Sequence, residues 1–133
     1  MSAPDALPAV RIACTGGRDH TPTPLELALF NAAWGQLGAT VLVHGNARGV
    51  DRAVGTHIEA LYGRDAVERH NADWQRYGRA AGAIRNGTML RSVVDGIPVS
   101  ALVAFPGGNG TADCGRAGRA VGYTCVSRDR VTE

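Results

Sequence analysis

Three short apolar segments of this chain each run directly into a glycine-rich turn and then into a helical pattern. The most complete is residues 99–105 (VSALVAF), which lead into the turn at residues 106–111 (PGGNGT). The same order recurs at residues 11–19 (RIACTGGRD) and 41–51 (VLVHGNARGVD). Turns of this kind are typical of α/β proteins, because glycine lets the backbone turn sharply between a strand and a helix. We therefore expect a parallel sheet whose strands are connected by helices.

The three turns also predict where a ligand binds. In a parallel sheet the carboxyl ends of the strands meet at one edge, and open α/β sheets bind ligands there. Thr111 is placed to cap a helix whose free N–H groups and positive dipole end favour an anion. A phosphate-bearing ligand is therefore expected. The candidate binding residues from the turns are Thr15, Gly16, Gly17, Arg18, His44, Gly45, Asn46, Asp51, Pro106, Gly107, Gly108, Asn109, Gly110 and Thr111.

The hydrophobic pattern alternates between strand and helix along the chain. Thr23, Pro24 and Glu26 have the spacing of a capping box with proline at the first helical position, so a helix is expected to run to about residue 37, before Gly38. The other expected helices are residues 51–62, 79–94 and 112–121, and the expected strands are residues 10–14, 40–43, 66–69, 99–105 and 123–126. This alternation predicts a mainly parallel sheet of about five strands with helices on both faces.

The length and composition fit a single domain. The chain has 133 residues, of which 44% are hydrophobic, enough for one core. We expect residues 1–133 to form one domain with its core at about residues 10–126 and frayed ends at residues 1–8 and 128–133. No apolar run reaches the ~20 residues that a membrane span needs, and the first nine residues lack the features of a signal peptide. A cytoplasmic protein without a membrane partner is expected.

The charged residues and cysteines exclude several kinds of site. All 14 basic residues are arginine, which rules out a phosphate-binding lysine and a Schiff-base lysine, although a GC-rich genome would give the same bias. The net charge of +2 does not by itself indicate nucleic acid. Cys14, Cys114 and Cys125 are widely spaced and suggest neither a disulfide framework nor a zinc site. The histidines lack metal-ligand spacing, so no metal and no cofactor are predicted.

Several individual residues have two interpretations from the sequence alone. Asp51 is expected to cap the helix that it begins, with contact to a ligand hydroxyl as the alternative. His44 would face the crevice as a base or ligand contact, although a lone histidine is more often a structural donor. Trp74 and Tyr77 either stack on a base or anchor their loop, and anchoring is favoured. Met89 is expected in the core.

Six short motifs, taken together and in order, resemble one known family. They are residues 15–19 (TGGRD), 44–51 (HGNARGVD), 72–74 (ADW), 77–82 (YGRAAG), 85–89 (RNGTM) and 104–111 (AFPGGNGT). This set spans roughly residues 10–126 and resembles the YspA-type, YpsA-related branch of the SLOG superfamily. The resemblance implies a Rossmann-like three-layer sandwich that binds a nucleotide or a nucleotide derivative, including molecules of the NAD or ADP-ribose type.

The resemblance also raises an enzymatic alternative. The related Lonely Guy phosphoribohydrolases carry an arginine on the third helix and glutamates after the Pro-Gly-Gly-x-Gly-Thr motif. Arg85 matches that arginine, whereas the glutamate positions read Asp113 and Cys114 here. Aspartate is one methylene shorter, and a misplacement of ~1 Å can cost about 100-fold in rate. Hydrolysis of a nucleoside monophosphate by Arg85 and Asp113 is therefore the alternative to simple binding.

The expected partners follow from these readings. The main expectation is a sensor or sequestering module in which residues 107–111 hold phosphate and residues 16–18 hold a second anionic or ribose group. Arg85 would neutralise charge, and Asn86 would help to orient Arg18 or Arg85. Binding of single-stranded nucleic acid is a second alternative, favoured if Arg48, Arg52, Arg76 and Arg79 form one basic track. Small residues at positions 80–83 and the pairing of related SLOG proteins near the site imply a homodimer.

Overall fold

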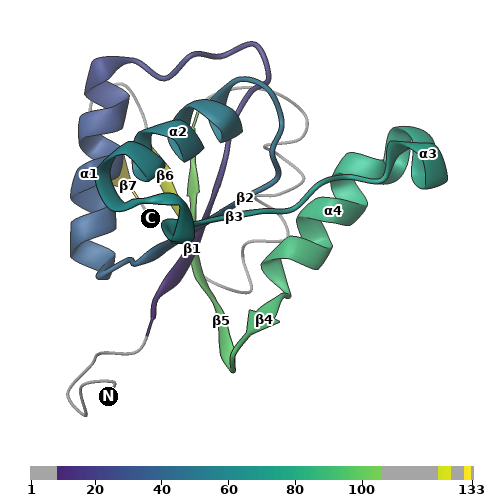
Figure 1. Cartoon of the computed structure of the whole chain (residues 1–133). Helices are drawn as coiled ribbons and strands as arrows, with labels where there is room; N and C mark the ends of the chain where they lie inside the picture. Colours follow the sequence, from purple (N-terminus) through teal and green to yellow (C-terminus); the bar gives the residue numbers. More distant parts are fainter. Residues whose placement is uncertain (1–8, 106–122, 127–130, 133) are drawn as a thin grey trace.

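The computed structural model describes residues 9–105, 123–126 and 131–132, which form a mixed sheet flanked by helices (Figure 1). Within these residues the strand order is β3-β2-β1-β5-β6-β7, and β4 pairs with β5. The strands are β1 (Arg11–Thr15), β2 (Val41–His44), β3 (Val67–Arg69), β4 (Val93–Val94), β5 (Ile97–Ala104), β6 (Tyr123–Val126) and β7 (Val131–Thr132). Neighbours from β3 to β6 are parallel, whereas β4 and β7 pair antiparallel. The α/β class is as expected, but the sheet is mixed, which corrects the expected mainly parallel sheet of about five strands.

The antiparallel strands β4 and β7 lie where the sequence predicts the end of a helix and a frayed chain end. Residues 79–94 were expected to form one helix, but the chain forms α3 (Trp74–Tyr77), a 3₁₀ turn η2 (Gly78–Ala80) and α4 (Ala81–Leu90), and then turns into β4. Asp95 and Gly96 have positive φ angles of 52° and 79°, the conformation of a two-residue hairpin turn. Residues 131–132, expected to be frayed, pair with β6. The expected helix at residues 112–121 lies outside the described residues.

The first two long helices begin and end close to the residues that the sequence predicts. Thr23 Oγ1 accepts a hydrogen bond from Glu26 N at 3.1 Å, and Glu26 Oε1 accepts one from Thr23 N at 2.9 Å. This reciprocal pair confirms the capping box at the start of α1 (Pro24–Leu37), and Gly38 ends the helix with a φ of 65°. The next helix, α2 (Val50–Tyr62), ends at Gly63 as predicted, before the 3₁₀ turn η1 (Arg64–Ala66). Among the described helices none is long and apolar enough to cross a membrane.

Two groups of buried side chains pack the helices onto opposite faces of the sheet. Phe30 and Trp34 of α1 and Val54 of α2 pack with the strand residues Ile12 and Leu42. The neighbouring strand residues point the other way, because side chains alternate along a strand. On that face the cluster consists of Ala13, Val43, Leu102, Val99, Met89 and Leu90, the last two from α4. Met89 is 1% exposed, which confirms its expected place in the core.

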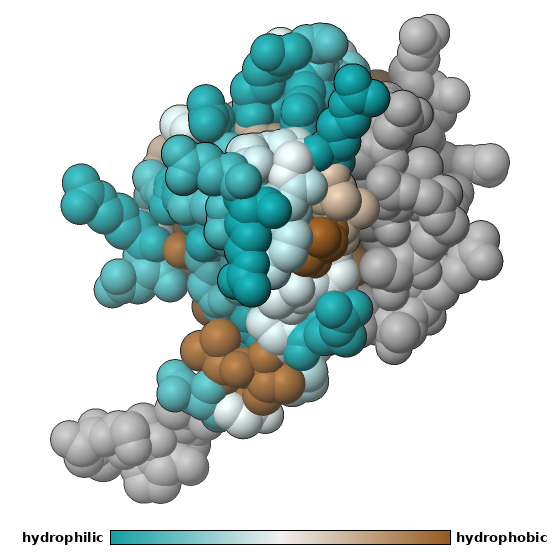
Figure 2. Space-filling model, turned by 90° about the vertical axis from the view of Figure 1, so that its right-hand side faces the viewer, coloured by the Kyte–Doolittle hydropathy of each residue, from teal (hydrophilic) through white to brown (hydrophobic). Residues whose placement is uncertain are grey.

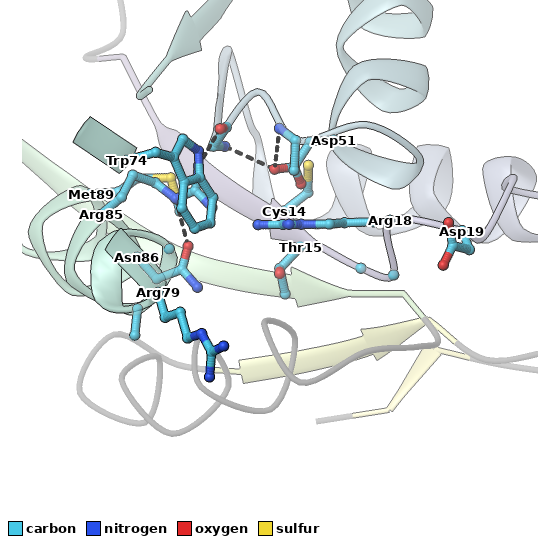
Figure 3. A pocket seen from close by; sticks show the side chains of 16 residues that line it. Cys14, Thr15, Arg18, Asp19, Asp51, Trp74, Arg79, Arg85, Asn86 and Met89 are labelled. Carbon is cyan, nitrogen blue, oxygen red and sulfur yellow. Dashed lines mark hydrogen bonds between the residues drawn. The ribbon is translucent and has the colours of Figure 1, made fainter. Parts of the chain in front are cut away.

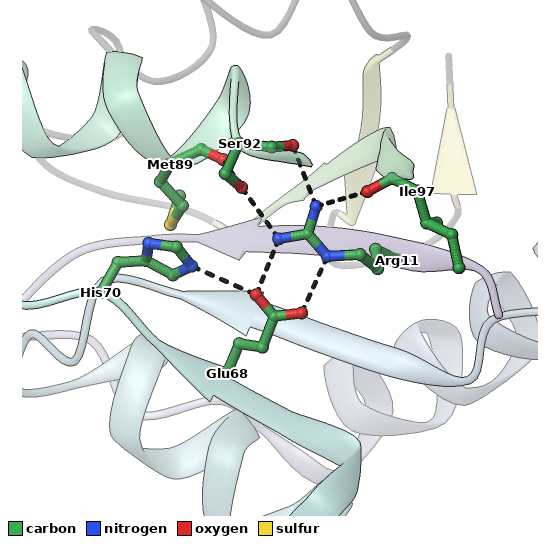
Figure 4. A network of polar contacts seen from close by, with 6 residues as sticks. All are labelled: Arg11, Glu68, His70, Met89, Ser92 and Ile97. Atoms are coloured by element: carbon green, nitrogen blue, oxygen red, sulfur yellow. Dashed lines mark hydrogen bonds and ion pairs between the residues drawn. The ribbon is translucent and has the colours of Figure 1, made fainter. Parts of the chain in front are cut away.

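The arginine that begins β1 is buried in a network of polar contacts (Figure 4). Arg11 is 2% exposed, and its guanidinium donates two hydrogen bonds to the Glu68 carboxylate, at 2.8 and 2.7 Å. It also donates to the carbonyl oxygens of Ser92 and Ile97, each at 2.9 Å, and to Ser92 Oγ at 2.8 Å. His70 Nε2 lies 3.3 Å from Glu68 Oε1. This network joins β1 and β3 to the start of the β4–β5 hairpin.

The order of the strands determines which loops come together. From β1 the chain adds β2 and β3 on one side and later places β5 on the other side, so the order reverses at β1. In register, Thr15 pairs with Ala104, and His44 pairs with Arg69. The carboxyl ends of these parallel strands therefore share one edge, and a crevice at such a reversal is the usual ligand site of an open α/β sheet.

Candidate functional site

A cavity of about 460 Å³, here called cavity A, lies at this edge between the ends of β1 and β2 and the helix α4 (Figure 3). It brings together eight of the residues that the sequence marks as ligand-binding candidates. They are Thr15, Gly16, Gly17, Arg18, Gly45, Asp51, Arg85 and Asn86. Asn46 lies outside cavity A, and residues 106–111 and Asp113 lie outside the described part of the chain. Cavity A is in the size range of sites for small molecules.

The glycines of the first two turns allow the two loops to lie directly against each other. A Cβ atom on Gly16 would stand 2.5 Å from the Val50 side chain. Gly49 has a φ of +81°, and a Cβ there would stand 2.4 Å from the carbonyl oxygen of Gly17. That carbonyl accepts a hydrogen bond from Val50 N at 3.3 Å. Loop packing therefore requires glycine at positions 16 and 49, whereas Gly17 lines the cavity.

Asp51 shapes the second turn and does not cap α2. The N-terminal cap position is Gly49, which makes no side-chain capping bond, so the expected capping role of Asp51 is wrong. Instead, Asp51 Oδ2 accepts hydrogen bonds from Gly45 N at 3.1 Å and Ala47 N at 3.2 Å. The carboxyl is 6% exposed and borders cavity A. Its burial raises the pKa of Asp51, and the bonds from Ala47 and Gly45 with the charge of Arg85 act in the opposite direction.

Arg85 reaches from α4 to the ends of β2 and β3. Its Nε donates to Asn86 Oδ1 at 2.8 Å, and its Nη1 donates to the carbonyl oxygens of Gly45 and, at 3.3 Å, His70. A Cβ on Gly45 would stand 2.4 Å from the guanidinium carbon, so glycine is needed for this contact. Asn86 is 5% exposed and borders the cavity. The pair places a cation and an amide together at cavity A, in contact with the turn after β2.

Arg18 extends across cavity A to the indole ring of Trp74 (Figure 3). The guanidinium carbon lies 4.9 Å from the ring centroid, a distance typical of a cation–π contact. Trp74 is 47% exposed, so about half of its surface is open to solvent, and whether it anchors the loop or stacks on a base stays a prediction. Tyr77 is 40% exposed and pairs in the same way with Arg76, at 5.2 Å. Unlike Trp74, Tyr77 does not border cavity A.

His44 is buried behind the site. Its side chain is 0% exposed and does not border cavity A, although the sequence placed it facing the crevice. Asn46 N donates to His44 Nδ1 at 2.8 Å, which leaves Nε2 to carry the ring proton. Burial, followed by the positive charges of Arg69, His70 and Arg85, lowers the pKa of His44 to about 4. Within the described residues Nε2 has no hydrogen-bond partner, and a Cβ on Gly55 would lie 2.6 Å from it.

Gly55 of α2 and Gly35 of α1 both lie inside helices, so the same substitution can be compared at a crowded and at an open position. Gly55→Ala should destabilise the protein by about 1–3 kcal/mol, because the new methyl group overlaps a buried ring. Gly35→Ala should stabilise it by about 0.5–1 kcal/mol, since alanine is the better helix former and no atom lies within 4 Å of a Cβ there. Urea unfolding of both variants measures the difference. Equal and favourable effects would show that His44 does not pack tightly against α2.

A second cavity, here called cavity B, adjoins cavity A. It has a volume of about 510 Å³ and is bordered by the end of β2, the start of α2 and the segment that follows β3. Arg18, Trp74 and Arg85 border both cavities. Cavity B also has Asn46, Arg48, Arg52, Asn71 and Ala72 along it. Asn71 was not among the candidates from the sequence, because it follows a short and weakly predicted strand.

The four arginines that would form a basic track for nucleic acid do not all border the same cavity. Arg48 and Arg52 border cavity B, Arg79 borders cavity A, and Arg76 borders neither. Arg48 also forms an ion pair with Asp19 at 3.0 Å. Arg79 is a cavity residue that the sequence analysis assigned only to this track. Binding of single-stranded nucleic acid through these arginines stays a prediction.

The small residues expected to pair with a second copy, at positions 80–83, are exposed only in part, because Ala81 is buried in the protein. In the arm formed by α3 and α4 (Figure 1), Ala80 and Ala83 are exposed and Ile84 is 40% exposed. Figure 2 faces this arm and shows mostly hydrophilic side chains, with an apolar patch at the level of the β4–β5 hairpin. Val93 and Val94 of that hairpin are 61% and 43% exposed. Pairing of two copies through this side stays a prediction.

Comparison with known proteins places the chain beside a phage protein. Neither a protein-family profile nor a solved structure matches the chain. The chain is 35% identical over 94 residues to the Gene 61 protein of Mycobacterium phage D29, an alignment that covers 65% of this chain and 70% of that protein. The chain therefore belongs to the same family as the Gene 61 protein of Mycobacterium phage D29.

Proposed function

We propose that cavity A binds a nucleotide or a nucleotide derivative and that the protein acts as a cytoplasmic sensor or sequestering module for it. The observation that carries this proposal is the cavity itself, which combines a glycine turn, three arginines and a half-exposed tryptophan at the carboxyl edge of parallel strands. Backbone N–H groups and arginine suit phosphate, and an exposed indole suits a base. Molecules of the NAD or ADP-ribose type belong to this class.

The charges around cavity A favour an anionic ligand. Arg18, Arg79 and Arg85 border it. Of the two carboxylates that border it in the described residues, Asp19 is paired with Arg48, and Asp51 accepts two backbone hydrogen bonds. The local balance is therefore positive, and an anion would gain from the surrounding guanidinium groups.

A Rossmann-like three-layer sandwich is part of the same proposal. It is supported by the parallel strands from β3 to β6, by the reversal of strand order at β1 and by helices packed on both faces. In folds of this kind the crevice at the reversal is where nucleotides bind. The glycine turn after β1 lies at that crevice.

Binding is proposed in preference to hydrolysis of a nucleoside monophosphate. A phosphoribohydrolase needs a carboxylate at the ribose carbon that develops positive charge. Asp51 is the buried carboxylate that borders cavity A in the described residues, and its Oδ2 is held by the loop. Hydrolysis by Arg85 with Asp113 remains the alternative, and release of free base distinguishes it.

A side chain added at Gly82 should block ligand binding without unfolding the protein. A Cβ on Gly82 would point among Trp74, Arg18 and Arg85, at 3.4, 3.8 and 4.0 Å from their nearest atoms. Gly82→Leu should therefore fill cavity A and weaken nucleotide binding at least ~10-fold, since the ligand would have to displace the leucine. Gly87→Leu on the same helix is the control, because Gly87 borders neither cavity and the nearest atoms to a Cβ there belong to the flexible Arg91 side chain.

The measurement is a thermal-shift and calorimetric titration with mononucleotides, NAD and ADP-ribose, since a ligand of the native state raises its apparent stability. The same mixtures are then analysed for free base. Binding by the native protein and by Gly87→Leu, but not by Gly82→Leu, is the expected result. Absence of binding by the native protein to every compound would refute the proposal, and rapid base release would favour the hydrolase.

A further inference from the structure

We infer that cavity B is a second anion subsite, which takes a phosphoryl group on a second unit joined to the nucleotide in cavity A. This inference rests on the proposed function of cavity A. It makes the ligand a nucleotide with two phosphorylated or phosphate-linked units, and not a mononucleotide. The shared chemistry is a second phosphate, which either a pyrophosphate-linked or a phosphodiester-linked dinucleotide carries.

The wall of cavity B has an unusual charge balance. Four of its ten described residues are arginines, from three different parts of the chain, and none is acidic. Arg48 has one carboxylate partner, Asp19, and that ion pair is exposed to solvent, with Asp19 89% exposed. An exposed ion pair contributes little to stability, so a phosphate can compete for this arginine at low cost. Four guanidinium groups around one polar hollow favour a phosphate over a neutral or apolar group.

The loops of cavity B are held in place by side-chain contacts. Arg52 Nε donates to the carbonyl oxygen of Asn46 at 3.1 Å, and Asn46 Nδ2 donates to Asn71 Oδ1 at 3.0 Å. These bonds fix the turn after β2 against the segment after β3. The Arg48 and Arg52 side chains are therefore presented from a braced loop, which reduces the entropy lost when a ligand binds.

The two cavities share lining residues that suit the middle of such a ligand. Both are bordered by Arg18, Trp74 and Arg85, together with Gly45 and Ala47. Trp74 is 47% exposed, so a base or ribose can lie against its ring with the linking phosphate beside it. Arg18 is held against the same ring at 4.9 Å. One ligand can therefore occupy both cavities, with cation contacts at each end.

The test compares one-unit and two-unit ligands on two double variants. Arg48→Ala/Arg52→Ala removes the cations that border cavity B but not cavity A, and Arg64→Ala/Arg76→Ala removes two exposed arginines that border neither. Mononucleotides are titrated beside NAD, ADP-ribose and the 5′-phosphorylated dinucleotides pApA, pGpG, pCpC and pUpU. Loss of hydrogen bonds to charged groups predicts that the first variant weakens a two-unit ligand ~10-fold or more.

The first variant should weaken mononucleotides much less than two-unit ligands, because Arg48 touches cavity A only through its ion pair with Asp19. Equal weakening of both kinds of ligand would contradict the inference, and the control variant should match the native protein for every ligand. The tighter two-unit ligand, pyrophosphate-linked or phosphodiester-linked, identifies the source of the second phosphate. If two-unit ligands bind no more tightly than mononucleotides, or are unaffected by the first variant, the inference fails while cavity A keeps its proposed function. If no nucleotide binds the native protein at all, both fail. Thermal unfolding of each variant shows that the fold is retained.

Discussion

Replacing Arg11 by alanine should lower the free energy of unfolding by about 3–5 kcal/mol, because it removes a buried guanidinium and leaves the partly buried Glu68 carboxylate without that partner. Arg11 is 2% exposed and donates five hydrogen bonds, two of them to Glu68 (Figure 4). The variant would also leave the carbonyl oxygens of Ser92 and Ile97 without this donor. Urea unfolding monitored by circular dichroism measures the loss.

Arg64→Ala is the matched control, since Arg64 is exposed on a 3₁₀ turn, and it should change stability by less than about 0.5 kcal/mol. The pH dependence gives a second readout. The hydrogen bond from Arg11 is the largest cause that lowers the pKa of Glu68 from its ordinary 4.5. That contribution is present above pH 4.5 and is lost as the pH falls through the lowered pKa of the folded state. Arg11→Ala should lack this loss, and an Arg11 variant within 1 kcal/mol of the native protein would contradict the role given to the network.

Local features of the fold could be predicted from the sequence, whereas this network could not. The capping box at Thr23 and the stop at Gly38 depend on residues three or four positions apart, so the sequence shows both partners at once. The partners of Arg11 lie 57 and 81 residues away, at Glu68 and Ser92. In the sequence, an arginine next to an apolar run is typical of the exposed end of a strand. Only the pairing of strands reveals that it is buried.

The β4–β5 hairpin was missed although its signal is local. The Asp95-Gly96 pair is among the strongest hairpin signals, yet residues 79–94 carry enough helical spacing to conceal it. The spacing of the apolar residues predicts a helix that continues past Leu90, whereas α4 ends there. The turn-forming Asp95-Gly96 pair therefore determines the structure here, and the hydrophobic spacing before it does not.

The meeting of the turns after β1 and β2 at cavity A was predictable, because parallel strands bring their carboxyl ends to one edge. The orientation of single residues at that edge was not. An acidic residue at the start of a helix usually caps it, which is why Asp51 was expected to cap α2. Instead its carboxylate accepts hydrogen bonds from the backbone N–H groups of Gly45 and Ala47 in the preceding loop. The side chain of His44, at the end of β2, points into the interior towards Gly55. The alternation of side chains along a strand does not by itself tell whether the last one faces the interior or the crevice. The turn at residues 106–111 stays a prediction.

The largest effect on ligand binding is expected from Arg18. The structure gives its guanidinium no hydrogen bond or salt bridge to any residue that it describes, and the side chain lies against Trp74 where the two cavities meet. Arg18→Ala should therefore leave the folded state nearly as stable as before. It should weaken nucleotide binding by about 10- to 100-fold, the value of about 1.5–3 kcal/mol for a hydrogen bond to a charged group.

Arg76→Ala is a close control for that variant. Arg76 is also an exposed arginine stacked on an aromatic ring, at 5.2 Å from the centroid of Tyr77, but it borders neither cavity. The two variants lose the same kind of cation–π contact, so a difference between them in calorimetric titration reports the ligand and not the stacking. If Arg18→Ala and Arg76→Ala bind nucleotides equally well, Arg18 does not contact the ligand. The site would then have to use Arg79 or Arg85 as its principal cation, because these are the other arginines that border cavity A in the described chain.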